Sequence, residues 1–285
     1  PRDHRRDHSR RRRRSRGRRM STATLTRAAR HAHVGGIEFF VYGDGAPVTV
    51  FAHGLAGSVS ETKPLAMPLA GTRVLFNFRG HGGSDPLPGG WDYDLLAHDL
   101  RVVADHVGAT GACGLSLGAG ALLRILTATP DRFDRLAFVM PAALDQASND
   151  GAIARLRALG AAIESGDRER LTEVLLEEVP ADLRDLRVTR VLLARRAAEL
   201  AVMTPPAPAR VDVPVRNVST LRAVKAPALV LAQEGDVLHS TDVAHRISDA
   251  LSTSTLEVLP PAGVFWTAPD QTRTALRHAL TPEHL

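Results

Sequence analysis

The stretch Thr110-Gly-Ala-Cys-Gly114-Leu115-Ser116-Leu117-Gly118 decides the fold of this 285-residue chain. Its last five residues have the pattern G-x-S-x-G, in which two glycines let a strand turn abruptly into a helix and leave the serine hydroxyl exposed. The flanking sequence fits this pattern: residues 110–114 are typical of a short buried strand, and residues 119–128 of a helix that Pro130 ends. We therefore predict a strand, a tight turn that carries Ser116, and a helix. The start of that helix would favour negative charge near Ser116.

The rest of the chain alternates between strand and helix signals, which favours a mostly parallel sheet with helices on both faces. Short, continuous apolar runs occur around residues 74–76, 136–140 and 228–232. Strands that are covered on both faces have this composition. The predicted fold class is therefore α/β, with a doubly covered sheet.

Three further segments carry a resemblance to a known superfamily. Residues 48–58, which contain His53-Gly54-Leu55, look like a strand followed by an oxyanion loop, and residues 76–85 look like the next strand and its turn. Residues 227–239 look like the late strand whose following loop carries a catalytic acid. In this order the segments resemble the α/β-hydrolase superfamily, from about Gly35 to the end of the chain.

The resemblance implies roles for individual residues. Ser116 would be the nucleophile and Asp236 the acid, and the backbone N–H groups of Leu55 and Leu117 would form the oxyanion hole. Some members of the superfamily carry the acid after the preceding strand, which here would be Asp145. The Glu-Gly-Asp context favours Asp236. No metal and no cofactor is expected.

The resemblance fails at the position of the catalytic base. After the last predicted strand, residues 255–260, the superfamily pattern Ala-Gly-His is expected, but the chain has Ala262-Gly263-Val264. A valine side chain cannot accept the proton of the serine. In a serine hydrolase, loss of the histidine costs on the order of a millionfold in turnover. Val264 therefore marks a lost base and puts ordinary triad hydrolysis in doubt.

Another histidine could replace the missing base. His239, three residues after Asp236, is the best candidate, although a hydrogen bond to the acid loop is the role that its position favours. His53 and His81 are interpreted as structural residues of their loops. The histidines expected on helix surfaces are His98, His106, His245 and His278.

Composition and helical spacing suggest three regions. Residues 1–19 hold eleven Arg and two Asp, so the net charge of +5 comes from this segment alone. We interpret it as a disordered leader, to be excluded from function. Residues 20–142 and 220–285 are predicted to form the α/β-hydrolase core. Residues 143–219 are predicted to form a helical cap over the pocket, with a third helix running from Asp182 to Met203.

Other function classes receive no support from the sequence. Without the leader nothing indicates nucleic-acid binding, and no apolar stretch approaches the length of about 20 residues that spans a membrane. The single cysteine, Cys113, excludes an internal disulfide. A cytoplasmic enzyme with a small-molecule substrate is the default expectation, and the sequence does not indicate an oligomeric state.

Three functions remain open at this point. The chain could be an acyl hydrolase or transferase in which another base, preferably His239, activates Ser116. It could be a repurposed lyase, cyclase or isomerase of a biosynthetic pathway that uses the oxyanion hole without an acyl-enzyme. It could also be an inactive protein that only binds a ligand.

Overall fold

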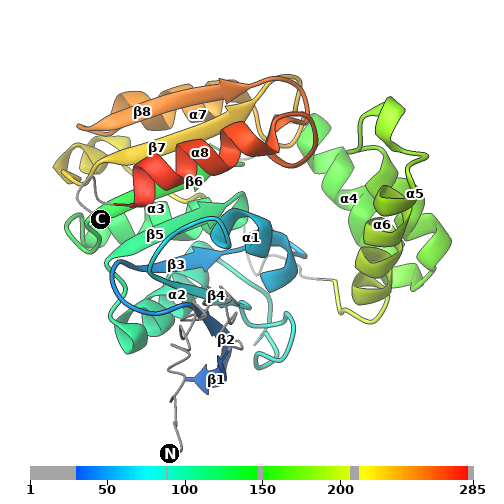
Figure 1. The fold of residues 1–285 in the computed structure, drawn as a ribbon, viewed down its shortest axis with the longest axis horizontal. Coiled ribbons are helices and arrows are strands. Elements are labelled where there is room, and N and C mark those ends of the chain that lie inside the picture. Colours follow the sequence, from blue (N-terminus) through cyan, green and yellow to red (C-terminus); the bar gives the residue numbers. More distant parts are fainter. Residues whose placement is uncertain (1–29, 88, 147–149, 206–211, 282–285) are drawn as a thin grey trace, which may run out of the picture.

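A computed structural model describes residues 30–87, 89–146, 150–205 and 212–281. The predicted leader at residues 1–19 lies outside these ranges. In Figure 1 the sheet and its helices form one body, and helices α4, α5 and α6 lie together to one side of it.

The core is an eight-stranded sheet with the strand order β1-β2-β4-β3-β5-β6-β7-β8. Strands β1 and β2 are antiparallel to their neighbours, and every pairing from β4 to β8 is parallel. This confirms the predicted mostly parallel sheet. The strands are β1 (Arg30–Val34), β2 (Ile37–Tyr42), β3 (Val48–Ala52), β4 (Thr72–Phe76), β5 (Gly111–Leu115), β6 (Arg135–Val139), β7 (Ala228–Gln233) and β8 (Ser254–Leu259).

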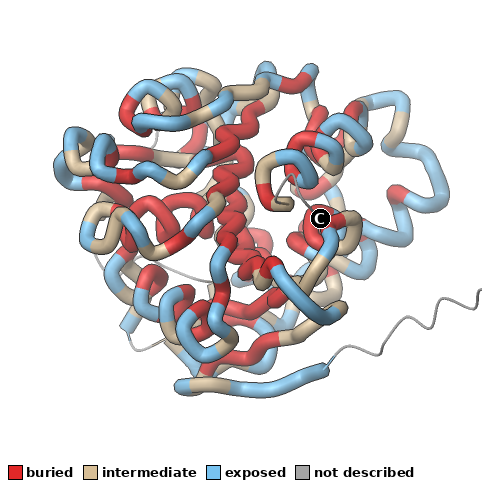
Figure 2. Tube along the Cα trace, turned by 60° about the vertical axis from the view of Figure 1, so that its left-hand side comes forward, coloured by how far each residue is buried: buried red, intermediate tan, exposed pale blue. Residues whose placement is uncertain are grey.

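Helices cover both faces of the sheet. The apolar faces of α2, α3 and α7 join one buried cluster, and those of α1 and α8 join a second cluster on the opposite face. Figure 2 shows these buried residues running through the middle of the molecule. The helices are α1 (Val59–Ala66), α2 (Tyr93–Val107), α3 (Leu117–Ala128), α4 (Asp150–Ser165), α5 (Arg168–Leu176), α6 (Arg187–Leu200), α7 (Thr241–Ala250) and α8 (Pro269–Leu280).

The central strands are apolar because helices cover them on both sides. All five residues of β5 are buried, as are four of the five in β6 and five of the six in β7. Cys113 lies in β5 and is 3% exposed. Burial raises the pKa of its thiol to about 12, so it is a core residue, as expected.

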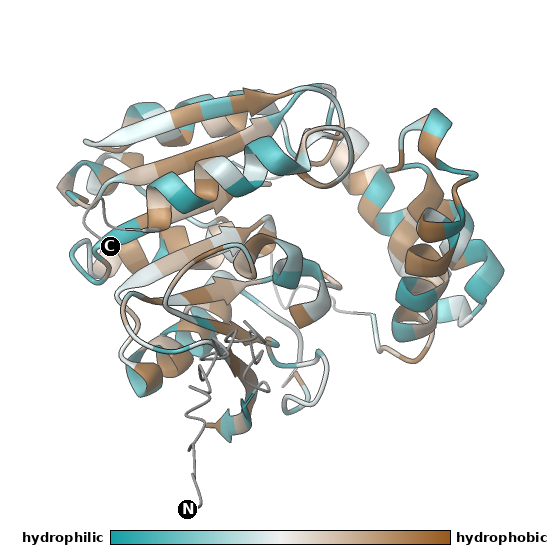
Figure 3. Cartoon of the chain, in the orientation of Figure 1, coloured by the Kyte–Doolittle hydropathy of each residue, from teal (hydrophilic) through white to brown (hydrophobic). Residues whose placement is uncertain are grey.

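The segment between β6 and β7 contains helices and no strand within its described residues. Helices α4, α5 and α6 pack around a third buried cluster. Figure 3 shows apolar residues along the central strands and where α5 and α6 meet. The predicted helix from Asp182 to Met203 is wrong in its bounds: a short 3-10 turn covers Ala181–Leu183, and α6 begins only at Arg187. The apolar spacing continues across this break, which is why the sequence suggested one helix.

The chain returns from α6 to the sheet through a buried ion pair. Arg124 on α3 donates to both carboxylate oxygens of Asp212 at 3.0 Å, and also to the carbonyl of Val213. Asp212 accepts the backbone N–H of Tyr93 at 3.1 Å. The side chains of Arg124 and Asp212 are 9% and 7% exposed. This pair therefore joins the start of α2 and the middle of α3 to the returning segment.

Among the described residues, no helix is long and apolar enough to cross a bilayer.

Replacing Arg124 by Met should lower the free energy of unfolding by about 3 kcal/mol, because the buried carboxylate of Asp212 would lose its closest cation and keep only the exposed Arg216 at 3.5 Å. Urea denaturation measures the loss. The control is Arg273→Met on α8, whose ion pair with Asp270 is exposed and should cost less than about 1 kcal/mol. Equal losses in the two variants would contradict a structural role for the buried pair.

Candidate active site

Ser116 lies at the turn between β5 and α3 in a strained backbone conformation. Its φ and ψ are 52° and −111°, and its N–H donates to the carbonyl of Val139 at 2.9 Å. Glycine is required on both sides of it. A Cβ atom on Gly114 would lie 2.5 Å from the carbonyl oxygen of Gly118, and one on Gly118 would lie 2.4 Å from that of Ala52. The predicted turn therefore has the geometry that its two glycines permit.

A chain of hydrogen bonds joins the serine to a histidine and an aspartate. Ser116 Oγ lies 2.9 Å from His239 Nε2, and His239 Nδ1 lies 2.9 Å from Asp236 Oδ2. A carboxylate can only accept a hydrogen bond, so Nδ1 of the neutral imidazole carries the proton. Nε2 then has the free lone pair and accepts the Ser116 O–H bond. The orientation is the one in which a histidine can act as a general base toward a serine.

The carboxylate of Asp236 is held in place by its own loop. Oδ1 accepts the backbone N–H groups of Leu238 and His239 at 2.9 and 3.1 Å. Oδ2 accepts the side-chain amide of Gln233 at 2.8 Å, besides the imidazole. Burial opposes ionisation, but hydrogen bonds and charge from His239, together with Gln233 and Leu238, outweigh it and lower the pKa of Asp236 to about 2. The residue is therefore a carboxylate at neutral pH.

Asp236 and His239 both belong to the loop between β7 and α7. The tight turn at Gly235, with a φ of 69°, starts this loop, and the side chain of Ser240 caps α7. Position alone favoured a bond between His239 and the acid loop. The structure contains that bond, and the other nitrogen of the same ring reaches Ser116.

Val264 occupies the loop after β8 and is 1% exposed. Its side chain belongs to the buried cluster beneath β7 and β8, and the turn Gly263–Thr267 has π-helical hydrogen bonding. Its N–H donates to the side-chain oxygen of Gln233 at 3.1 Å. Gln233 therefore joins this loop to Asp236, a role that the sequence analysis did not assign, although the residue lies in the segment that was compared with the superfamily.

The predicted oxyanion loop lies against the serine. A Cβ atom on Gly54 would be 3.4 Å from Ser116 Cβ, and the N–H of Gly54 donates to Glu61 Oε2 at 3.0 Å. The next turn is closed by the N–H of Gly57, which donates to the carbonyl of Gly54 at 3.0 Å. Within the described part of the chain, the N–H groups of Leu55 and Leu117 have no hydrogen-bond acceptor. Both donors are therefore free to bind an oxygen atom.

His53 and His81 are buried and lack the geometry of a base. His53 Nδ1 donates to the carbonyl of Gly54 at 2.7 Å, and Nε2 accepts the N–H of Phe78 at 3.1 Å. Burial, followed by the charges of His81 and Arg196, holds the pKa of His53 well below its usual value. Burial also lowers the pKa of His81. Both are structural residues of their loops, as predicted.

The remaining candidates lie elsewhere. Asp145, the alternative acid, pairs with Arg246 at 2.6 Å, whereas His239 pairs with Asp236. The four other histidines interpreted as surface residues are exposed on helices: His98, His106, His245 and His278.

Residues of the helices between β6 and β7 reach the same region. Arg196 on α6 donates to the carbonyl of Ala56, and Ser60 donates to Glu199 at 3.2 Å. Ala56 and Trp266 of the core pack against the buried cluster of these helices. The helices therefore contact the core at the oxyanion loop and at the loop that contains Val264.

Glu178 lies just beyond α5, and its side chain is 52% exposed, with Arg155 Nη2 3.5 Å away. Partial desolvation raises the pKa of Glu178. The positive charges of Arg155 and His239 oppose this shift, and the negative charges of Glu61 and Asp236 add to it. The carboxylate next to the serine is that of Glu61, since a Cβ atom on Gly54 would be 3.4 Å from both Glu61 Oε2 and Ser116 Cβ.

A cavity of about 240 Å³ opens beside the loop that carries His239. Leu238 and Ser240, the neighbours of His239, line it together with Ala142, Leu144 and Val243. Its wall is partly apolar.

Solved structures of several enzymes have the same fold. Carboxylesterase CesB from Bacillus subtilis is 18% identical, with a TM-score of 0.70 over 89% of this chain and 91% of its own. Naproxen esterase from Bacillus subtilis is also 18% identical, with a TM-score of 0.70 over 89% and 92%. An enol-lactonase from Burkholderia xenovorans is 20% identical, with a TM-score of 0.67 over 87% and 98%.

The sequence itself matches a family model. Residues 49–275 match the model described as the alpha/beta hydrolase family. This range includes the oxyanion loop, the turn at Ser116 and the loop that carries Asp236 and His239. Because the match covers well over half of the chain, the protein belongs to the alpha/beta hydrolase family.

Proposed function

We propose that this protein is a serine hydrolase of small, uncharged carboxylic esters, with Ser116 as nucleophile, His239 as general base and Asp236 as the orienting acid. The observation that carries the proposal is the pair of 2.9 Å contacts that joins Ser116 to His239 and His239 to Asp236. Esterases and a lactonase among proteins of this fold are in keeping with that reaction class.

The first half of the reaction forms an acyl-enzyme. Ser116 Oγ attacks the carbonyl carbon of the ester while His239 Nε2 takes its proton. The carbonyl oxygen becomes an oxyanion, which the N–H groups of Leu55 and Leu117 stabilise. When the tetrahedral intermediate collapses, the bond to the leaving oxygen breaks, and His239 returns the proton to the departing alcohol.

The second half regenerates the serine. Water replaces the alcohol, His239 takes its proton, and the hydroxide attacks the acyl carbon. Collapse of this second intermediate releases the carboxylic acid and returns the proton to Ser116 Oγ. Throughout both halves Asp236 stays ionised, in keeping with its pKa of about 2.

The case for non-hydrolytic chemistry or for an inactive binding protein came from Val264, the apolar residue at the expected base position. Both alternatives lose support because the imidazole of His239, from the neighbouring loop, lies within hydrogen-bond distance of Ser116. A base in this position supplies the proton transfer that Val264 cannot supply.

Electrostatics favour uncharged substrates. Glu61 lies beside Gly54 and Ser116, the charge of Glu178 influences the same group of residues, and hydrolysis itself produces a carboxylate there. An anionic group on the substrate would be repelled by these charges. The cavity beside the loop of His239 is lined by apolar side chains together with Asp242 and Arg246, and its volume of about 240 Å³ suits a small group of the ester.

The unmodified protein should react covalently with a fluorophosphonate, because Ser116 already has a base. Intact-mass spectrometry should show one adduct, absent in Ser116→Ala. His239→Ala should lower kcat for an uncharged p-nitrophenyl ester by three to six orders of magnitude, in line with the loss of a triad histidine.

His245→Ala, which removes an exposed histidine from α7, is the matched control and should keep full activity. If the protein reacted only after Val264→His, or if His239→Ala kept its rate, the proposed base would be wrong.

Gln233 should act as a positioning residue for Asp236. Gln233→Glu places a second carboxylate at the 2.8 Å contact with Asp236, so one of the two must bind a proton. We expect kcat to fall about 100-fold at pH 6 and the acidic limb of the kcat profile to move to higher pH. Gln233→Met, which removes the hydrogen bond without adding charge, should cost about tenfold with the limb unmoved. This role would be contradicted if the acidic limb of the kcat profile lay at the same pH in both variants.

Glu178→Gln should raise kcat/KM for an ester that carries a carboxylate, relative to an uncharged ester of equal length. Charges several ångströms apart in a wet cleft interact by about 0.5–1 kcal/mol, which corresponds to a two- to fivefold change in this ratio. Glu177→Gln is the control, because it removes one carboxylate from the neighbouring position that also pairs with Arg155. An unchanged ratio in Glu178→Gln would show that this carboxylate does not select against anions.

A further inference from the structure

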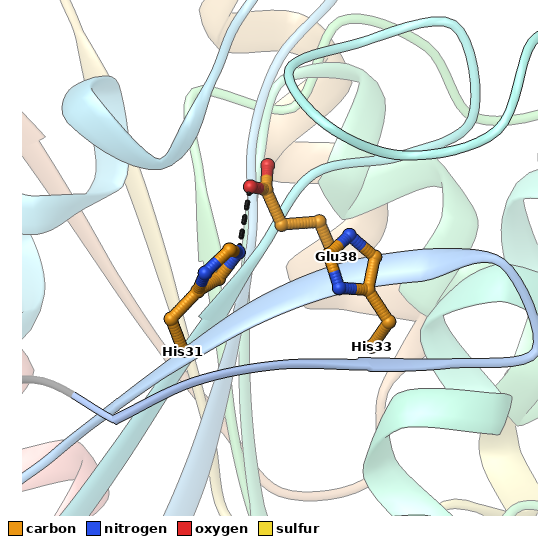
Figure 4. Close-up of side chains that lie close together, drawn as sticks. All are labelled: His31, His33 and Glu38. Carbon is orange, nitrogen blue, oxygen red and sulfur yellow. Dashed lines mark hydrogen bonds and ion pairs between the residues drawn. The ribbon is translucent and has the colours of Figure 1, made fainter.

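The edge of the sheet carries a cluster of metal-ligating side chains that the proposed reaction does not use. His31 and His33 lie on β1, the edge strand, and Glu38 lies on the neighbouring strand β2. One ligand atom from each of the three side chains lies within 4.8 Å of the other two. Figure 4 shows both imidazoles on the side of the hairpin that carries the Glu38 carboxylate.

Strand geometry produces this arrangement. Residues two apart in a strand point to the same face, so His31 and His33 are neighbours on that face. In the antiparallel register His33 is directly opposite Glu38. The imidazole rings are 5.2 Å apart between centroids. The turn between the strands, at Gly35 and Gly36, therefore fixes which carboxylate meets the two histidines.

The carboxylate is oriented by a second layer of hydrogen bonds. Glu38 Oε2 accepts the side-chain amide of Asn77 at 2.6 Å and the N–H of Gly83 at 2.7 Å. Oε1 is directed toward His31 Nε2, at 2.9 Å. Carboxylates that bind metals are commonly held in this way by groups outside the coordination sphere.

His33 is oriented as well. Its Nε2 lies 3.2 Å from the carbonyl oxygen of Gly83, and a carbonyl can only accept, so Nε2 carries the proton. The free lone pair of the neutral ring is then on Nδ1. Donation of one ring N–H to a backbone carbonyl is the usual arrangement for a metal-binding histidine.

We propose that His31, His33 and Glu38 form a binding site for a divalent transition-metal cation of the zinc class, with the remaining coordination positions open to water. Two imidazoles and one carboxylate suit such a cation. Bonds of about 2.0–2.2 Å in tetrahedral geometry bring ligand atoms to about 3.4 Å from one another. Since the ligand atoms now lie within 4.8 Å of one another, the site requires a contraction of up to about 1.4 Å, which the exposed imidazoles can provide by rotation.

The site is separate from the catalytic residues. Four strand spacings separate β1 from β5, which precedes Ser116, or about 19 Å across the sheet. A bound cation would join the edge hairpin, through Glu38, to the loop that contains Asn77 and Gly83. It should stabilise the folded state without taking part in hydrolysis.

The test uses the full chain after removal of metals with EDTA. Titration calorimetry with ZnCl₂ should show one site, and Co²⁺ should give the visible spectrum of a nitrogen-ligated ion. His31→Gln and His33→Gln should each weaken Zn²⁺ binding at least tenfold, because each removes a ligand. His245→Gln is the control and should bind Zn²⁺ as the unmodified protein does.

Two results would overturn the proposal. One is the absence of Zn²⁺ binding tighter than about 1 mM. The other is binding that persists in both His31→Gln and His33→Gln, which would place the ion elsewhere, for example on His4 and His8. Ester hydrolysis is measured in parallel with and without EDTA, so that failure of the metal site and failure of the proposed reaction are distinguished.

Discussion

The site depends on how closely the turn at Ser116 packs against the end of β3. Because a Cβ atom on Gly118 would lie 2.4 Å from the carbonyl oxygen of Ala52, only glycine lets α3 begin at this distance. The same approach brings Gly54 against Ser116, and the N–H groups of Leu55 and Leu117 have no acceptor among the described residues. One steric constraint thus brings together Ser116 and two free N–H donors, which the proposed reaction uses as nucleophile and oxyanion hole. Strain at Ser116, with its positive φ, is the cost of that arrangement.

The proposed acid and base, Asp236 and His239, are three residues apart, which changes how the site is supported. When the histidine follows the last strand, its position relative to the acid depends on the packing of two loops. Here Asp236 accepts the N–H of His239 as well as its imidazole, so one short loop fixes their mutual geometry. Gln233 still joins this loop to the one that contains Val264. The loop after β8 instead buries the apolar side chain of Val264, and its Trp266 packs against the cluster of α4, α5 and α6.

The sequence predicted the fold well because its signals are local. The strands β5, β6 and β7 and the turn at Ser116 lie where they were predicted. Their apolar runs and glycines depend on residues that are close in the sequence. Asp236 was placed by its Glu-Gly-Asp context. The reach of His239 to Ser116 could not be predicted, because the two residues are 123 positions apart and the contact depends on the path of one loop. Glu178 was missed for the same reason. The influence of its charge on Asp236 depends on how the helices after β6 pack against the core.

If His239 is the base, as proposed, its position also limits which features can be exchanged within this fold. A histidine can move from the loop after β8 to the loop after β7 because the carboxyl ends of neighbouring parallel strands meet at one edge of the sheet. From either loop an imidazole can lie between the acid and the serine. The serine and the two backbone donors have no such freedom, since their positions follow from the contact between α3 and β3. Under the proposed mechanism the base is therefore the residue whose loop can change, and Val264 is weak evidence against catalysis while His239 lies 2.9 Å from Ser116.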